Sequence, residues 1–153
     1  MERTFWIIKD DRQKANAAAA LATCPVNPKK PFYVQIKQYD EKRSDAQNRL
    51  SHKWYLDISQ QGREYTPEQV KSRCKSRYGL PIMLEDEAFS LFWKHATASN
   101  PTYEQVVDEI MPLTPLTSIM GVKKMSQYLT DLQNEMGSKY QLTDPSMYGL
   151  ERL

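Results

Sequence analysis

Apolar residues occupy every second position of FYVQI, residues 32–36, and polar residues lie between them. This period of two is that of a half-buried strand, and it predicts a strand over residues 32–39. Residues 3–9, RTFWIIK, are rich in aromatic and β-branched side chains and predict an earlier strand. Between the two, DRQKANAAAALA predicts a helix, because alanine loses almost no side-chain entropy on forming one. The opening of the chain therefore predicts a β-α-β unit.

Further along the chain, apolar residues recur every three or four positions, which is the period of an amphipathic helix. SDAQ at residues 44–47 and TPEQ at residues 66–69 have the spacing of capping boxes, so each predicts a helix start. We expect the first of these helices to end near Gly62 and the second to stop at Gly79. Residues 80–82 then predict a loop or a short extended piece.

The second half of the chain predicts three more helices. Acidic residues 85–87 favour a helix start, because the helix dipole stabilises negative charge there. A short helix is expected over residues 100–111. The last helix is predicted to be capped by Thr117 or Ser118 and to end at Gly137. The apolar face of that helix consists of Met125, Tyr128, Leu129, Leu132 and Met136.

These elements predict an α+β fold, with an N-terminal β-α-β unit followed by a mostly helical remainder. We expect residues 1–153 to form one domain, with residues 138–153 as a loosely ordered tail. Its 153 residues, 40% of them apolar, are enough to bury a core. No apolar run of about 18 residues predicts a membrane span, and the start lacks the pattern of a secretory signal. Cys24 and Cys74 are far apart, which indicates two reduced thiols in a cytosolic protein.

The charges are unevenly distributed, although the formal net charge is only +2. Residues 29–77 contain twelve Lys or Arg and six Asp or Glu, whereas residues 83–110 contain one Lys and six acidic residues. One interpretation is a phosphate-binding surface beside an acidic face that repels nucleic acid or contacts a partner. The alternative is chance clustering of solvated side chains.

The basic stretch includes residues 42–54, KRSDAQNRLSHKW. Its Lys-Arg pair, residues 42–43, directly precedes a predicted helix start, where unpaired N–H groups and partial positive charge favour an anion. Arg49 lies further along the same helix, and Lys53 lies one turn beyond Arg49. The Gln-Asn pair, residues 47–48, is able to bond to sugar or base edges. Helix capping and solvation are the alternative explanation for all of these residues.

A second basic cluster follows on the next predicted helix. Lys71 and Lys75 share one helical face, whereas Arg73 and Arg77 share another. We expect one pair to face nucleic acid and the other to be solvated. The candidate DNA-contacting residues are Lys37, Lys42, Arg43, Gln47, Asn48, Arg49, Lys53, Lys71 and Lys75.

Aromatic residues are interspersed among these cations. Single-stranded nucleic acid is bound by such mixtures, in which charges follow the backbone and rings stack on bases. Trp54, however, lies in line with Leu50 and Ile58 on the predicted helix. We therefore expect Trp54 in the core.

Motifs for catalysis are not evident in the sequence. The two histidines, His52 and His95, are far apart, and neither a nucleophile elbow nor a phosphate-binding glycine loop is present. The Cys and His spacings do not fit a zinc site. Acidic residues 85–109 are the only candidates for a two-metal nuclease, and helix capping explains the first of them more simply. We expect no enzyme activity, no cofactor and no metal.

Three ordered motifs resemble the phage recombination family called NinB or Orf, including its prophage relatives in the YbcN group. They are PKKP at residues 28–31, RSDAQNR at residues 43–49, which fits an RS-x-x-QN-R signature, and DISQQ at residues 57–61. The resemblance covers residues 1–61 well and the remainder more loosely.

The resemblance implies an intertwined α+β homodimer with a basic channel that prefers single-stranded or gapped DNA. It implies a non-catalytic accessory protein of phage homologous recombination, in the cytoplasm of the bacterial host. Such a protein binds DNA with little sequence specificity and helps a recombinase load on strands coated by single-strand-binding protein. Carried over by position, the DNA-facing residues are Lys37, Arg43, Gln47, Asn48 and Arg49.

Two other functions are open on the sequence. One is a metal-dependent nuclease that uses acidic residues 85–109. The other is a protein-interaction module of a replication or recombination complex, docked through the same acidic region or through the last helix.

Overall fold

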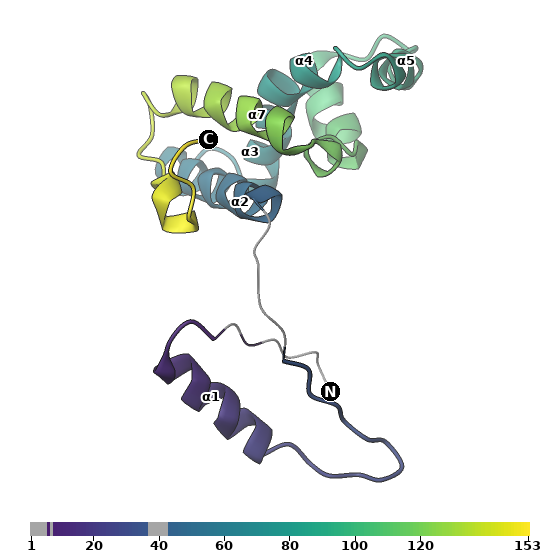
Figure 1. The fold of residues 1–153 in the computed structure, drawn as a ribbon. Coiled ribbons are helices and arrows are strands. Elements are labelled where there is room, and N and C mark those ends of the chain that lie inside the picture. Colours follow the sequence, from purple (N-terminus) through teal and green to yellow (C-terminus); the bar gives the residue numbers. More distant parts are fainter. Residues whose placement is uncertain (1–5, 7, 37–42) are drawn as a thin grey trace. The chain divides into compact units, whose positions relative to one another are not determined.

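The computed structural model describes residue 6, residues 8–36 and residues 43–153. The chain divides into two compact units, residues 1–40 and residues 41–153 (Figure 1). The described elements, in chain order, are α1 (Asp11–Ala22), α2 (Arg43–Gly62), α3 (Pro67–Cys74), η1 (Lys75–Gly79), α4 (Leu80–Met83), α5 (Glu87–Ala96), α6 (Tyr103–Gln105), η2 (Val106–Ile110), η3 (Met111–Leu113), η4 (Thr117–Ile119), α7 (Val122–Met136) and η5 (Pro145–Tyr148).

The prediction of an α+β fold with a β-α-β start is wrong. Over the described part of the chain, the structure contains helices and no strand. Residues 32–36 have the apolar alternation of a strand but are not paired, and most of the first predicted strand lies outside the described residues. A strand requires a partner for its N–H and C=O groups, and side-chain alternation does not supply one.

The helix predicted in the first unit is confirmed. The Asp10 carboxylate accepts a hydrogen bond of 2.8 Å from the Gln13 backbone N–H and caps α1. No residue of α1 is buried. The apolar side chains that follow are also exposed, with Val34 at 64% and Ile36 at 90% of their full accessibility.

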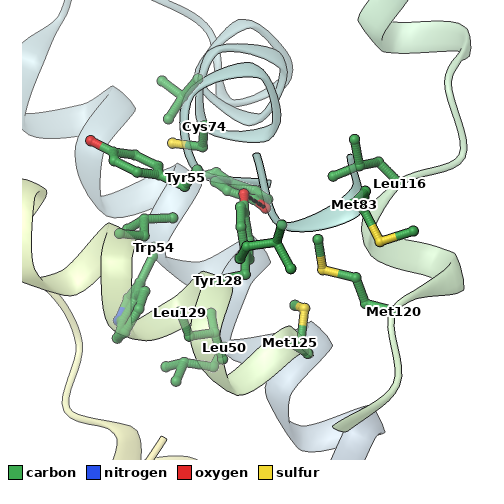
Figure 2. Packing of buried hydrophobic residues seen from close by; sticks show 14 of the residues in the cluster. Leu50, Trp54, Tyr55, Cys74, Met83, Leu116, Met120, Met125, Tyr128 and Leu129 are labelled. Carbon is green, nitrogen blue, oxygen red and sulfur yellow. Dashed lines mark hydrogen bonds between the residues drawn. The ribbon is translucent and has the colours of Figure 1, made fainter. Parts of the chain in front are cut away.

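The core of the second unit lies between α2, α3 and α7 (Figures 1 and 2). Trp54 and Tyr55 of α2 are fully buried, as are Tyr128 and Leu129 of α7. The Tyr55 and Tyr128 hydroxyls are 2.7 Å apart and satisfy each other, which removes the cost of burying them unpaired. Burial raises the pKa of both tyrosines. The predicted core position of Trp54 is confirmed.

The helix that begins at Thr66 does not stop at Gly79, as the sequence predicted. The capping box is present: Gln69 N–H donates to Thr66 Oγ1, and Thr66 N–H donates to Gln69 Oε1. The chain then passes through the π-helical turn η1 into α4, where a loop was expected. Gly79 serves packing here, because a Cβ at this position would overlap Leu116 Cδ2. Gly79 therefore allows Leu116 to approach the backbone closely, and it does not end the helix.

The later helices match their predictions more closely. Asp86 caps α5 through the Phe89 N–H, as the acidic residues 85–87 predicted. The buried face of α7 is the predicted one, and α7 ends before Gly137. Its start differs, because Thr117 lies in η4 and Gly121 is the residue before α7.

The C-terminal segment differs from the expected loose tail in its contacts with α2. Trp54 Nε1 donates a hydrogen bond of 2.7 Å to Thr143 O. The Gln61 side chain forms two hydrogen bonds of 2.8 Å with the Gln141 backbone: its Nε2 donates to Gln141 O, and its Oε1 accepts from the Gln141 N–H. Leu150 is buried. This segment therefore completes the packing around α2.

Candidate nucleic-acid interface

The exposed face of α2 carries most of the describable candidate residues. Asn48 and Arg49 are exposed, and Lys53, one turn further, is partly exposed. His52 lies beside them on the same exposed face. An α-helix brings positions three and four apart onto one side, so these polar residues form a continuous row. We call Asn48, Arg49 and Lys53 the α2 row.

Gln47 does not belong to this row. Its side chain is fully buried, and its Nε2 donates to Ser126 Oγ at 2.7 Å and to Val122 O at 3.4 Å. Gln47 therefore joins α2 to α7. The expected capping box would direct the Gln47 amide to the helix start, but this amide is directed to α7; the Ser44 side chain lies outside the described residues. The prediction of Gln47 as a DNA contact is inconsistent with this burial.

Two cations of the α2 row already have partners within the protein. The Arg49 guanidinium lies over the Tyr148 ring, 5.4 Å from its centroid. The Lys53 ammonium is 3.0 Å from Asp57 Oδ1. The Asp57 carboxylate also accepts hydrogen bonds from the backbone and hydroxyl of Thr143. Burial alone would raise the pKa of Asp57, but the hydrogen bonds from Thr143 and Lys53 lower it overall.

The second basic cluster is divided differently from the prediction. Lys75 is buried, at 5% of its full accessibility, and its ammonium donates hydrogen bonds of 2.8 Å to Met111 O and to Thr114 O. Desolvation, with a smaller contribution from the charge of Lys71, lowers the pKa of Lys75 to about 8. Lys71 itself is partly exposed. Lys75 therefore anchors the backbone of residues 111–114, and little of its side chain reaches the outer surface.

The other pair of this cluster is committed to partners on the protein. The Arg73 guanidinium stacks on the Tyr65 ring, 3.9 Å from its centroid. Arg77 forms an ion pair of 2.5 Å with Glu135 of α7. The arginine pair therefore stabilises tertiary packing, and Arg77 is the member of the cluster for which the described residues show an ion pair.

Three candidates cannot be placed in this geometry. Lys37 and Lys42 lie outside the described residues, and the same holds for the side chain of Arg43, whose backbone begins α2.

Cys24 and Cys74 are free thiols, and burial raises the pKa of Cys74 to about 12. Within the described ranges, no three His, Cys, Asp or Glu side chains converge in a way that could hold a metal ion. No described helix has the length and hydropathy needed to cross a membrane.

Comparison with protein families gives one match. The family model described as NinB protein matches residues 1–73. The resemblance to NinB is confirmed. No curated protein and no solved structure matches the chain.

The NinB match covers all of α2 and the part of α3 that carries Lys71. It ends at residue 73, before Lys75 and the acidic stretch. The match supports a role in phage recombination. It also divides the candidate residues, because those of the α2 row lie within the NinB segment and Lys75 lies outside it.

Two functional features were missed by sequence reasoning. Tyr148 contacts Arg49 from almost one hundred positions away, and no local pattern relates the two residues. The contact between Lys75 and the 111–114 backbone likewise depends on carbonyl groups, which every sequence contains.

Proposed function

We propose that this protein is a non-catalytic DNA-binding accessory factor of phage homologous recombination. It binds single-stranded or gapped DNA with little sequence specificity and assists loading of a recombinase on strands coated by single-strand-binding protein. The observation that carries the proposal is the exposed α2 row within the segment that matches NinB.

The row is suited to phosphate contacts because its cations reach the surface. Lys53 is partly exposed at its end of the ion pair with Asp57, and the buried Asp57 carboxylate also accepts two hydrogen bonds from Thr143. An exposed cation–π contact such as that of Arg49 and Tyr148 contributes about 0.5–1 kcal/mol. A phosphate at the surface is therefore able to contact these cations beside the partners that they already have. Because contacts to phosphate fix the strand without reading its bases, weak sequence preference follows.

The non-catalytic part of the proposal is supported by the roles of the acidic side chains. The nuclease alternative requires converging carboxylates in residues 85–109, but the Asp86 carboxylate is used as the cap of α5. Cleavage of DNA that depends on Mg²⁺ or Mn²⁺ and is lost in Asp108→Ala would refute this part.

We also propose that the protein is a homodimer. In the first unit, Phe32, Val34 and Ile36 are all exposed in the isolated chain. Three large apolar side chains in one short segment are costly to leave in water, and a second copy would cover them. Sedimentation of the intact protein tests this: a monomer at all concentrations contradicts the proposal, and a dimer weakened by Val34→Asp supports it.

Fluorescence anisotropy tests the DNA proposal. Labelled single-stranded, gapped and duplex oligonucleotides are titrated over a salt series, and the slope of log K against log salt counts the phosphates engaged. We expect Arg49→Ala to weaken binding to every sequence and to reduce that slope by about one. Lys94→Ala, which removes the same charge from α5, is the matched control and leaves binding unchanged. Absence of binding at low salt, or equal loss in both variants, contradicts the proposal.

A further inference from the structure

A cavity of about 420 Å³ lies beside the second basic cluster. It is lined by Lys71, Lys75 and residues 112–118, the segment PLTPLTS that runs from η3 into η4. The cavity therefore combines two amines with the hydroxyls of Thr117 and Ser118, both at least partly exposed. Ammonium and hydroxyl groups are donors that suit an oxyanion.

The positive charge at this cavity is not balanced from within the described part of the protein. Neither Lys71 nor Lys75 forms an ion pair with a described carboxylate. Desolvation lowers the pKa of both Lys75 and His52, and the charge of Lys71 lowers both further. Lys71 of α3 is thus close enough to disfavour the charge of Lys75 in η1 and of His52 in α2.

Lys75 has capacity for one more acceptor. Its ammonium carries three N–H donors, and the carbonyls of Met111 and Thr114 accept two of them. An amine this deeply buried has lost most of its hydration. An anion in the cavity would supply the third acceptor and would also offset the repulsion between Lys71 and Lys75.

We propose that this cavity is a phosphate-binding site, in which Lys71 and Lys75 together hold one phosphate group. The site deepens the proposed function where that phosphate belongs to a DNA strand, and to that extent it rests on it. A backbone phosphodiester, a terminal phosphate and inorganic phosphate present the same oxyanion chemistry. The experiment therefore includes an arm for each source.

The first arm measures binding of inorganic phosphate to the intact protein at constant ionic strength, with chloride as the reference salt. His52 and His95 are the only two histidines, so their NMR signals are readily separated. We expect phosphate to raise the pKa of His52, because it offsets the charge of Lys71. The NMR signal of His95 on α5 serves as the reference. In Lys71→Ala the response to phosphate is lost, and in Lys94→Ala it is retained.

Calorimetry on the same variants gives the affinity. We expect Lys71→Ala to weaken phosphate binding at least tenfold, and Lys75→Met to weaken it similarly if that variant is folded. Lys71 is partly exposed, so Lys71→Ala keeps the test decisive whatever happens to Lys75→Met. A His52 signal that ignores phosphate, or equal affinities in the parent protein and Lys71→Ala, overturns the proposal.

The second arm uses short single strands with and without a 5′-phosphate. Tighter binding of the phosphorylated strand, lost in Lys71→Ala, assigns the site to a strand end. Equal binding of both strands, weakened in Lys71→Ala, assigns it to the backbone. Strand binding that depends on Arg49 but not on Lys71 overturns the phosphate site and leaves the proposed function standing. If phosphate binding depends on Lys71 but the protein binds no strand, the phosphate site stands and the proposed function is overturned.

Discussion

The buried ammonium of Lys75 makes a specific prediction about how stability depends on pH. Its pKa is about 8 in the folded protein, against an ordinary value of 10.5. A basic group whose pKa falls on folding binds fewer protons in the folded state than in the unfolded state. Folding is therefore penalised at low pH, and the penalty is relieved as the pH rises from about 8 to 10.5. The sign is opposite to that of a lysine in an ion pair.

The size of the effect follows from the shift. Each pKa unit corresponds to about 1.4 kcal/mol, so the full penalty at neutral pH is about 3 kcal/mol. Between pH 7 and pH 9.5 the part that is relieved amounts to about 2 kcal/mol. Lys75→Met has no such group to titrate. The free energy of unfolding of the parent protein, minus that of Lys75→Met, should therefore rise by about 2 kcal/mol over this interval.

Urea unfolding at several pH values measures this difference. Tryptophan fluorescence is a suitable signal, because Trp54 is fully buried. The subtraction removes the buried tyrosines, whose raised pKa values make both proteins less stable at high pH. A difference that stays constant between pH 7 and pH 9.5 would refute the reasoning, since it would mean that Lys75 titrates alike in both states. The absolute stability of Lys75→Met does not enter the test.

Three more substitutions test the packing around α2 and α7. Gly79→Ala places a methyl group against Leu116 and should cost about 1–3 kcal/mol of unfolding free energy; combination with Leu116→Ala should give a non-additive result, and additivity would contradict the clash. Thr66→Ala removes the cap of α3 and should cost about 1 kcal/mol in urea unfolding, whereas an unchanged midpoint would show the cap to be dispensable. Trp54→Phe leaves Thr143 O without its donor and should cost about 1–3 kcal/mol, with faster amide exchange in the C-terminal segment as the diagnostic sign.

Local signals in the sequence predicted local structure well. The Thr66 box, the Asp86 cap and the alanine-rich α1 were all found where residue chemistry placed them, because each depends on atoms within four positions. The apolar face of α7 was also predicted, since helical spacing identifies a buried side without naming its partner. Such features require no knowledge of the tertiary fold.

The errors came from residues whose role depends on distant parts of the chain. Gln47 was predicted to cap a helix, but its side chain donates a hydrogen bond to Ser126 of α7. Gly79 was predicted to end a helix, but in the structure it provides the space that Leu116 occupies. The FYVQI alternation, residues 32–36, indicated a strand, but alternation does not create the second strand that pairing requires. In each case the partner that decides the residue's role, or the lack of one, is not visible in the few neighbouring positions on which the prediction was based.

The candidate site was predicted in part for the same reason. Asn48 and Arg49 are exposed as expected, because helical spacing opposite Leu50 and Trp54 determines which side faces water. Lys75 lies four positions after Lys71, on the same helical face, but Lys75 is buried. Spacing identifies a helix face, but only the rest of the fold determines whether that face is covered.

The extent of the NinB match has a consequence for how the α2 row is held. The matched segment, residues 1–73, contains α2 and most of α3, but not α7 or the C-terminal segment, which also pack against α2. Within the second unit, Trp54 and Tyr55 pack against α7 and the C-terminal segment, and two members of the row contact or depend on that segment through Tyr148 and Thr143. A fragment that ends at residue 73 would expose the large side chains of α2, which are costly in water. The DNA-binding surface that we propose on the NinB segment is therefore held in place in part by residues that the family model does not match.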